Sequence, residues 1–327
     1  MSGQIRWGIL GTGWIAHQQT ADLIGNGFTV TAVGSRTQES ADAFAAEFGI
    51  PSAHGSYEAL VADPDVDVVY ISTPHPFHAA AALLALRAGK HVLIEKSFTI
   101  NAAEAREVVS VAAANKLVAL EAMWTRFLPH MLRIREIIAA GTLGEVRTLI
   151  ADHNQNLPKD PEHRINNPEL GGGALLDLGI YPVSFAFDLF GVPSSVKAIA
   201  SMTETGVDRQ TAIIFGYGDG QQAVLHTALD TLGPNTAVVL GTEGRIEIDS
   251  VWYTPTTFTV FDSDDRVIER FEQPERTRGM QFQAWEVERL IDAGLTGGTI
   301  LPPSESLQIM ETLDEIRRQI GLKYPGE

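Results

Sequence analysis

The feature that most constrains this 327-residue chain is a glycine pattern close to its N-terminus. The apolar run Ile5–Leu10 leads directly into Gly11-x-Gly13-x-x-Ala16, where a helical pattern begins. The first glycine permits a tight strand-to-helix turn, the second lets the backbone approach a pyrophosphate, and the alanine keeps the helix close to the sheet. The positive end of that helix faces the phosphate charge. The pattern predicts a Rossmann unit that binds a dinucleotide. The other residues of the turn that we expect at the cofactor are Thr12, Trp14 and Ile15.

Short apolar runs alternate with helical patterns as far as Trp124, which is typical of a doubly wound parallel sheet. Beyond it, a series of strand patterns is separated by short turns such as Gly218-Asp219-Gly220, which favours antiparallel pairing. We therefore expect an α/β protein with a Rossmann domain over 1–124. An α+β domain with a large, mostly antiparallel open sheet would follow over 125–327. The closing helices, expected over 278–293 and 304–319, can alternatively pack back on the first domain.

Composition excludes several classes of protein. A net charge of −17 argues against a nucleic-acid partner, because binding phosphate backbones needs a basic surface. The longest apolar runs, such as Ala79–Leu86, are too short to span a bilayer, and Met1–Trp7 does not resemble a signal peptide. The absence of cysteine excludes disulfides and cysteine-ligated zinc, and it fits a reducing cytosol. We expect a cytoplasmic protein with a small-molecule substrate and no membrane partner.

The end of the second expected strand indicates which dinucleotide binds. Enzymes that prefer NAD usually carry an acidic residue there, which accepts a hydrogen bond from the ribose 2′-hydroxyl. This chain has Gly34-Ser35-Arg36-Thr37 instead. Ser35 and Arg36 can donate to a 2′-phosphate, and the guanidinium can also stack on adenine. The sequence therefore favours NADP over NAD, with a solvated loop arginine as the alternative interpretation.

Two further groups of residues follow apolar strands, at the edge where ligands of open α/β sheets bind. We expect Thr73, Pro74 and His75 at the cofactor, together with His78, for which a structural role is equally compatible with the sequence. Glu95 and Lys96 end the next strand, and an ionisable pair emerging at this edge favours a functional role over an ordinary surface ion pair.

The second expected domain contributes Gly171-Gly172-Gly173 and, shortly after it, Asp177 and Tyr181, four residues apart and so on one helix face. Three consecutive glycines let the backbone come close to a ligand or another chain. The other expected substrate contacts are Trp124, Phe127, His153 and Arg164, against which core packing or a solvated loop are the alternatives. Asp152, His153, His163 and Asp177 lack the helical spacing of metal ligands, so we expect no metal.

Together these motifs resemble the Gfo/Idh/MocA oxidoreductase family, and Glu121–Pro129 is similar to its NADP-linked trans-1,2-dihydrobenzene-1,2-diol dehydrogenase branch. The resemblance implies that the open sheet forms dimer contacts, and we expect a homo-oligomer, a dimer or tetramer. It also implies that Lys96 is the lysine of a Glu-Lys-Pro motif and Asp177 the aspartate of an Asp-x-Gly motif. Ser97 departs from the proline of the first motif.

These residues suggest a reaction. We expect Tyr181 to donate a proton to a carbonyl oxygen while NADPH reduces the carbonyl carbon. An ammonium lowers the pKa of a tyrosine, so Lys96 would assist it, and Asp177 would position Lys96 or the substrate. The expected substrate is a sugar, cyclic polyol, trans-dihydrodiol or dicarbonyl. Two alternatives stay open: an inositol- or aldose-specific dehydrogenase, and a non-catalytic NADP-binding regulator.

Overall fold

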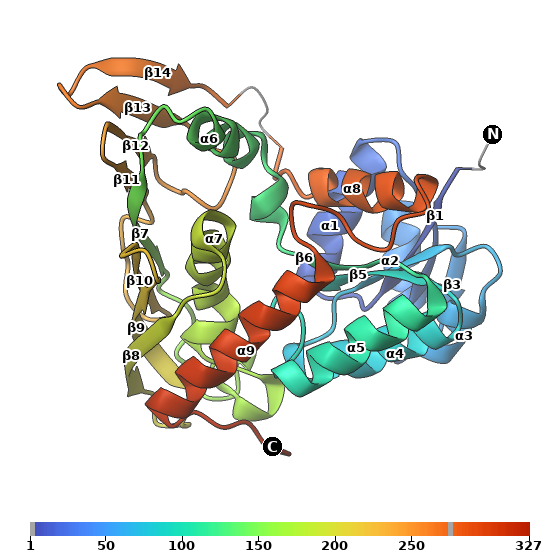
Figure 1. Cartoon of the computed structure of the whole chain (residues 1–327). Coiled ribbons are helices and arrows are strands. Elements are labelled where there is room, and N and C mark those ends of the chain that lie inside the picture. Colours follow the sequence, from blue (N-terminus) through green and yellow to red (C-terminus); the bar gives the residue numbers. More distant parts are fainter. Residues whose placement is uncertain (1–3, 274–276) are drawn as a thin grey trace. The chain divides into compact units, whose positions relative to one another are not determined.

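The computed structural model describes residues 4–273 and 277–327 (Figure 1). Met1–Gly3, which belong to the segment compared above with a signal peptide, lie outside the described residues. The chain divides into two compact units: unit 1 comprises Met1–Trp124 and Arg278–Met310, and unit 2 comprises Thr125–Thr277 and Glu311–Glu327. A single boundary after Trp124 therefore does not describe Arg278–Met310. That segment packs on the N-terminal helix: Gln283 Nε2 donates to Gln19 Oε1 at 2.8 Å.

Unit 1 contains six parallel strands in the order β3-β2-β1-β4-β5-β6. They are β1 (Arg6–Leu10), β2 (Thr29–Gly34), β3 (Ser52–His54), β4 (Val68–Ile71), β5 (His91–Glu95) and β6 (Ala119–Ala122). The helices are α1 (Trp14–Gly25), α2 (Gln38–Phe48), α3 (Tyr57–Ala62), α4 (His78–Arg87), α5 (Ala102–Asn115) and α8 (Gln281–Asp292), with α9 (Pro303–Ile320) beginning here. Every residue of β4 and β6 is buried, as expected for strands covered on both faces. The Rossmann sheet is confirmed.

Local sequence explains where these helices begin and which face they bury. Asn101 caps α5, because its side chain accepts a hydrogen bond from the Glu104 N–H at 3.0 Å. The buried residues of α5 recur at helical spacing and are Ala102, Ala105, Val108 and Ala112. Small side chains on this stripe let the helix approach its neighbours closely.

Unit 2 contains an eight-stranded sheet in the order β14-β13-β12-β11-β7-β10-β9-β8. The strands are β7 (Val146–Asn154), β8 (Ser195–Met202), β9 (Asp208–Gly216), β10 (Gln222–Ala228), β11 (Ala237–Gly241), β12 (Gly244–Ile248), β13 (Phe258–Asp262) and β14 (Val267–Phe271). All neighbours are antiparallel except β7 and β10, whose register pairs Val224 with Ile150. The large, mostly antiparallel sheet is thus confirmed.

One face of this sheet is covered by helices. Figure 1 shows α6 (Pro129–Ala139) and α7 (Ile180–Phe190) on the same side of it. Side chains that point to this side, such as Leu149 and Leu225, are buried. On the opposite side Ile150 and Val224 are exposed, so that face is open.

One helical segment of the described residues, Pro168–Phe190, is long and apolar enough to span a membrane, contrary to the sequence-based expectation, but 83% of the tested window is buried inside the protein. It contains a π-helical turn, Leu175–Gly179, followed by α7. Ile180 to Phe187 are all buried, so α7 is a core helix.

Candidate active site

The candidate residues fall into one group in each unit, and each group is described by itself. In unit 1, Gly11 forms the turn between β1 and α1. Its φ of +101° is left-handed, and a Cβ there would lie 2.8 Å from Ser72 Oγ, so glycine is required. Gly13 is the N-cap of α1, and a Cβ on it would meet nothing within 4 Å. The helix N-terminus therefore faces open space at the second glycine. This geometry fits a pyrophosphate.

The end of β2 carries no carboxylate. Ser35 is buried, and its hydroxyl lies 3.3 Å from Thr12 Oγ1, while Arg36 is exposed. The Ser35 N–H donates to the His54 carbonyl at 3.0 Å, which fixes this corner of the sheet. A hydroxyl and an exposed guanidinium at the end of β2 fit a cofactor that carries a 2′-phosphate.

His78 connects the loops that follow β4 and β5. Its Nε2 lies 2.7 Å from the Thr73 carbonyl oxygen and its Nδ1 lies 2.8 Å from the Ser97 carbonyl oxygen. Burial lowers the pKa of His78 to about 4, and this outweighs the two carbonyl groups, which favour the protonated ring. A neutral ring carries one N–H, so His78 donates to one of these carbonyl oxygens and packs against the other; its position between the two loops favours the structural interpretation of His78. His75 is also buried, whereas Thr73 and Pro74 retain exposure.

Glu95 and Lys96 lie where β5 ends. Glu95 is buried, and the Tyr70 hydroxyl donates to its Oε1 at 2.5 Å. Burial raises the pKa of Glu95. Lys96 is half-buried, and the Lys96–Ser97 peptide bond is cis. Glu121 at the end of β6 was not expected from the sequence. It accepts hydrogen bonds from the Phe98 N–H at 3.1 Å and from Ser306 Oγ at 2.7 Å, and so supports the loop after Lys96.

Two tryptophans of unit 1 share one cation. Trp14, the first residue of α1, is 64% exposed, whereas Trp124 is buried, so core packing accounts for part of its role. The Arg278 guanidinium lies 4.9 Å from the ring centroid of Trp14 and 5.5 Å from that of Trp124. No pattern in the sequence pointed to Arg278.

In unit 2, Asp177 lies in the π-helical turn and is buried. The Arg164 guanidinium donates to its carboxylate at 3.3 Å, so these two candidate residues are brought together. The Arg164 side chain stays 52% exposed, so it remains accessible to a substrate, and both the substrate-binding and the solvated-loop interpretations stay predictions.

Tyr181 lies in a cluster of aromatic rings. Its ring centroid is 4.9 Å from that of His153 and 5.2 Å from that of Tyr253, and the His153 and Tyr253 rings stack at 3.7 Å. Gln155 Nε2 lies 2.8 Å from His153 Nε2. Tyr253 was missed because it lies in a loop, more than seventy residues along the chain from Tyr181, with no motif around it. The structure thus brings the expected Tyr181 and His153 together with this third ring.

The three glycines approach their own chain. A Cβ on Gly172 would lie 2.6 Å from the Ile165 carbonyl oxygen, and one on Gly173, at φ +115°, would lie 2.2 Å from Asp208 Oδ1. Asp208 Oδ2 accepts hydrogen bonds from the Leu175 N–H and from Thr211 Oγ1, both at 2.8 Å. Complete burial raises the pKa of Asp208 to about 7. This carboxyl group therefore fixes the start of the turn that carries Asp177.

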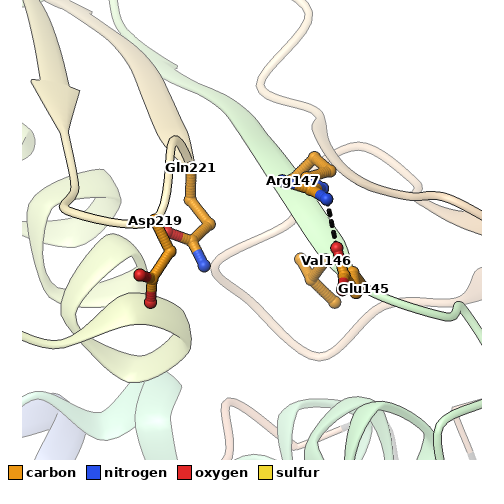
Figure 2. A pocket seen from close by; sticks show the side chains of 5 residues that line it. All are labelled: Glu145, Val146, Arg147, Asp219 and Gln221. Atoms are coloured by element: carbon orange, nitrogen blue, oxygen red, sulfur yellow. Dashed lines mark hydrogen bonds and ion pairs between the residues drawn. The ribbon is translucent and has the colours of Figure 1, made fainter.

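Other candidates do not join these groups. Phe127 is 3% exposed, which supports its packing interpretation. No group of three metal-ligating side chains gathers anywhere in residues 4–273 and 277–327. Figure 2 shows a polar pocket at the start of β7 and the turn after β9. Glu145 and Arg147 form an ion pair there, and none of the candidate residues lines it. The residues that line this pocket are Glu145, Val146, Arg147, Asp219 and Gln221.

Comparison with known proteins identifies the class. Residues 5–122 match the oxidoreductase family with an NAD-binding Rossmann fold, and residues 131–247 match the GFO/IDH/MocA C-terminal domain. The trans-1,2-dihydrobenzene-1,2-diol dehydrogenase of Mus musculus is 38% identical over 338 residues, which cover 99% of each chain. The chain therefore belongs to the Gfo/Idh/MocA oxidoreductase family, and the resemblance seen in its motifs is confirmed.

Solved structures agree with this assignment. A 3-ketoreductase from Actinomadura kijaniata in complex with NADP and TDP-benzene matches with a TM-score of 0.85 and 26% identity, covering 97% of this chain and 98% of that one. An aldose-aldose oxidoreductase from Caulobacter crescentus complexed with glycerol matches with a TM-score of 0.86 and 24% identity, covering 97% of each chain, and shows the fold alone. The protein is an oxidoreductase of the dehydrogenase or reductase type.

Proposed function

We propose that this protein uses NADP to interconvert a carbonyl and a hydroxyl group of a sugar, cyclic polyol, trans-dihydrodiol or dicarbonyl. The observation that carries the cofactor assignment is the end of β2, where Ser35 and Arg36 stand in place of an acid. The printed functions of the relatives, a dihydrodiol dehydrogenase and an NADP-complexed ketoreductase, support the substrate class. An inositol- or aldose-specific dehydrogenase is the alternative within enzymes.

The cofactor would be held by residues of unit 1. The N–H groups at the start of α1 would meet the pyrophosphate, and Ser35 with Arg36 would meet the 2′-phosphate. The loops after β4 and β5 would flank the nicotinamide half of the dinucleotide. Bound NADP(H) supplies or accepts the hydride. The residues assigned to this role are Gly11, Thr12, Gly13, Trp14, Ile15, Ser35, Arg36, Thr73, Pro74, His75, Glu95, Lys96 and Trp124. His78, also expected at the cofactor, would act by positioning the loops that carry Thr73 and Lys96.

The residue that donates the proton is assigned to unit 2. In the reducing direction Tyr181 gives its hydroxyl proton to the substrate oxygen, and in the oxidising direction it takes that proton back. The ammonium of Lys96 stabilises the phenolate that remains. Asp177 orients Lys96 or the substrate, and its ion pair with Arg164 at 3.3 Å holds the carboxylate in place. The aromatic rings of His153 and Tyr253 beside Tyr181 favour a substrate with an apolar ring face.

A substrate panel with Tyr181→Phe tests this assignment. We expect wild-type protein to turn over NADPH with at least one carbonyl of the proposed classes, followed by cofactor absorbance. Tyr181→Phe should lower kcat on the order of 100-fold or more, with the Kd for NADP unchanged. Tyr217→Phe is the matched control, because Tyr217 lies in the same unit and its buried hydroxyl has no hydrogen-bond partner among the described residues.

Two results would contradict the proposal. Unchanged kcat in Tyr181→Phe would remove Tyr181 from the proton transfer. Tight NADP binding without turnover of any substrate would favour the alternative of a non-catalytic NADP-binding regulator. Against that alternative, both Lys96 and Tyr181 are present in this chain.

We also propose that the open face of the large sheet pairs with a second copy of the chain. Three exposed apolar residues are neighbours across strands: Val224 on β10 pairs with Ile150 on β7 and with Ile214 on β9. Contiguous exposed apolar side chains on a sheet face can mark an interface between protein chains. Light scattering should report twice 35.4 kDa for the wild type. Ile214→Glu should give the monomer mass and Val192→Glu, an exposed apolar site outside the strands, should not. A monomeric wild type would contradict this.

The cytoplasmic location expected from the sequence stays part of the proposal. Fractionation of the source cells with an antibody to the protein tests it, and recovery from a secreted or membrane fraction would contradict it.

A further inference from the structure

Arg278 is a cation whose guanidinium contacts aromatic rings. It lies 4.9 Å from the ring centroid of Trp14 and 5.5 Å from that of Trp124, so two indole faces hold it. Its Nε atom is buried and has no hydrogen-bond partner among residues 4–273 and 277–327. A buried guanidinium N–H without an acceptor costs free energy, so a ligand that brings an acceptor would be favoured at this position.

The surroundings place this cation beside the dinucleotide turn. Trp14 is the first residue of α1 and follows Gly13, whose Cβ position is open. The charge of Arg278 also reaches the end of β5, because it opposes the rise that burial causes in the pKa of Glu95. All of these residues belong to unit 1. The guanidinium therefore contacts the first side chain of α1, and its charge acts on the end of β5; both elements flank the bound dinucleotide in a Rossmann unit.

We propose that Arg278 is a cofactor-binding residue and that its guanidinium donates hydrogen bonds to the pyrophosphate of the dinucleotide. This inference rests on the proposed function. Guanidinium groups suit the task because they bind phosphate in a bidentate manner and also stack on aromatic faces. A local cation matters in this chain in particular, because its net charge of −17 repels an anionic cofactor.

The two tryptophans give the arginine its geometry before the cofactor arrives. A cation held over indole rings has fewer conformations to lose on binding, so more of the phosphate interaction appears as affinity. The same contacts set Arg278 apart from Arg36. Arg36 follows β2 and faces the 2′-phosphate side, whereas Arg278 adjoins the glycine turn itself.

The test is calorimetric titration of NADP and of NAD into wild-type protein, Arg278→Ala and Arg278→Gln, at low and at high salt. Both cofactors contain the pyrophosphate, so we expect each variant to raise both Kd values by the same factor, on the order of 10-fold, with less effect at high salt. Arg278→Gln keeps part of the aliphatic side chain beside the indole rings, so this variant replaces Arg278→Ala in the titration if the alanine variant does not fold. The control is Arg87→Ala, which removes one exposed charge from the same unit and should leave both Kd values unchanged.

Other outcomes would overturn the inference in recognisable ways. A rise in Kd for NADP alone would place Arg278 at the 2′-phosphate. Unchanged Kd values with a lower Tm would make Arg278 a structural clamp. Unchanged Kd values with a higher KM for acidic substrates only would make its ligand a substrate anion. If the wild type bound neither cofactor, the proposed function itself would fail, whatever the variants did.

Discussion

Gly173→Ala should destabilise unit 2 severely, because the glycine is required by the chain's own packing. An L-residue in the left-handed region costs about 1–2 kcal/mol. In addition, the new Cβ would lie 2.2 Å from Asp208 Oδ1, a contact that no Cβ tolerates. The carboxyl group cannot yield cheaply, because its other oxygen accepts hydrogen bonds from Leu175 and Thr211. Loss of those two buried bonds adds roughly 3 kcal/mol, so we expect a total of at least about 4 kcal/mol.

The matched control is Gly141→Ala. Gly141 also has a positive φ, +75°, and lies in the same unit, but a Cβ there would meet nothing within 4 Å. It should cost only the backbone term of about 1–2 kcal/mol. Urea unfolding of both variants, followed by circular dichroism, measures the difference. If Gly173→Ala were no more destabilising than Gly141→Ala, the glycines would serve a ligand or another chain and not the contact with Asp208.

Two further perturbations test buried charge. Burial lowers the pKa of His130 to about 4, so as the pH falls the unfolded chain protonates this histidine before the folded chain does. The contribution of neutral His130 to the unfolding free energy is therefore complete above about pH 6.5 and is lost as the pH falls towards 4. Urea unfolding at about pH 6.5 and about pH 4 measures this loss of unfolding free energy, which should be smaller by about 3 kcal/mol in His130→Asn. An unchanged pH dependence in the variant would refute the reasoning. Asp188→Asn should lower the unfolding free energy by about 3–5 kcal/mol, because it removes the buried carboxylate that lies 3.1 Å from Arg126 and 2.8 Å from Arg135. The exposed control Asp264→Asn should cost no more than about 1 kcal/mol, and equal losses in thermal or urea melts would count against a buried pair.

Much of the fold could be predicted because its signals are local. The strand before Gly11, the cap at Asn101 and the apolar runs of the parallel sheet each lie within a few residues of sequence. β3 could not be predicted from the sequence, because a strand of three residues, Ser52–His54, is too short to show an alternation of polar and apolar side chains. α7 is buried from Ile180 to Phe187, and tertiary packing rather than its own residue pattern decides that environment.

The residues of the candidate site could be predicted where they belong to a sequence motif. They could not be predicted where segments far apart in the sequence supply them. Gly13, Lys96 and Tyr181 lie in recognisable stretches. Tyr253 and Arg278 lie in stretches without a pattern, and each acquires its meaning only from rings far away in the sequence. The π-helical turn at Leu175–Gly179 could not be predicted either, and its first N–H donates to Asp208, 33 residues further along the chain.

The most direct test of the proposed chemistry is to follow the transferred hydrogen. Wild-type protein is mixed with NADPH that carries deuterium on the transferring face of C4 and with a dicarbonyl or sugar substrate, and the product is analysed by mass spectrometry. Hydride transfer predicts that one deuterium per turnover appears on the carbon that becomes the alcohol, and that Tyr181→Phe slows its appearance. Bound NADPH that keeps its deuterium with every substrate would contradict the assignment of this protein as an NADP-dependent reductase.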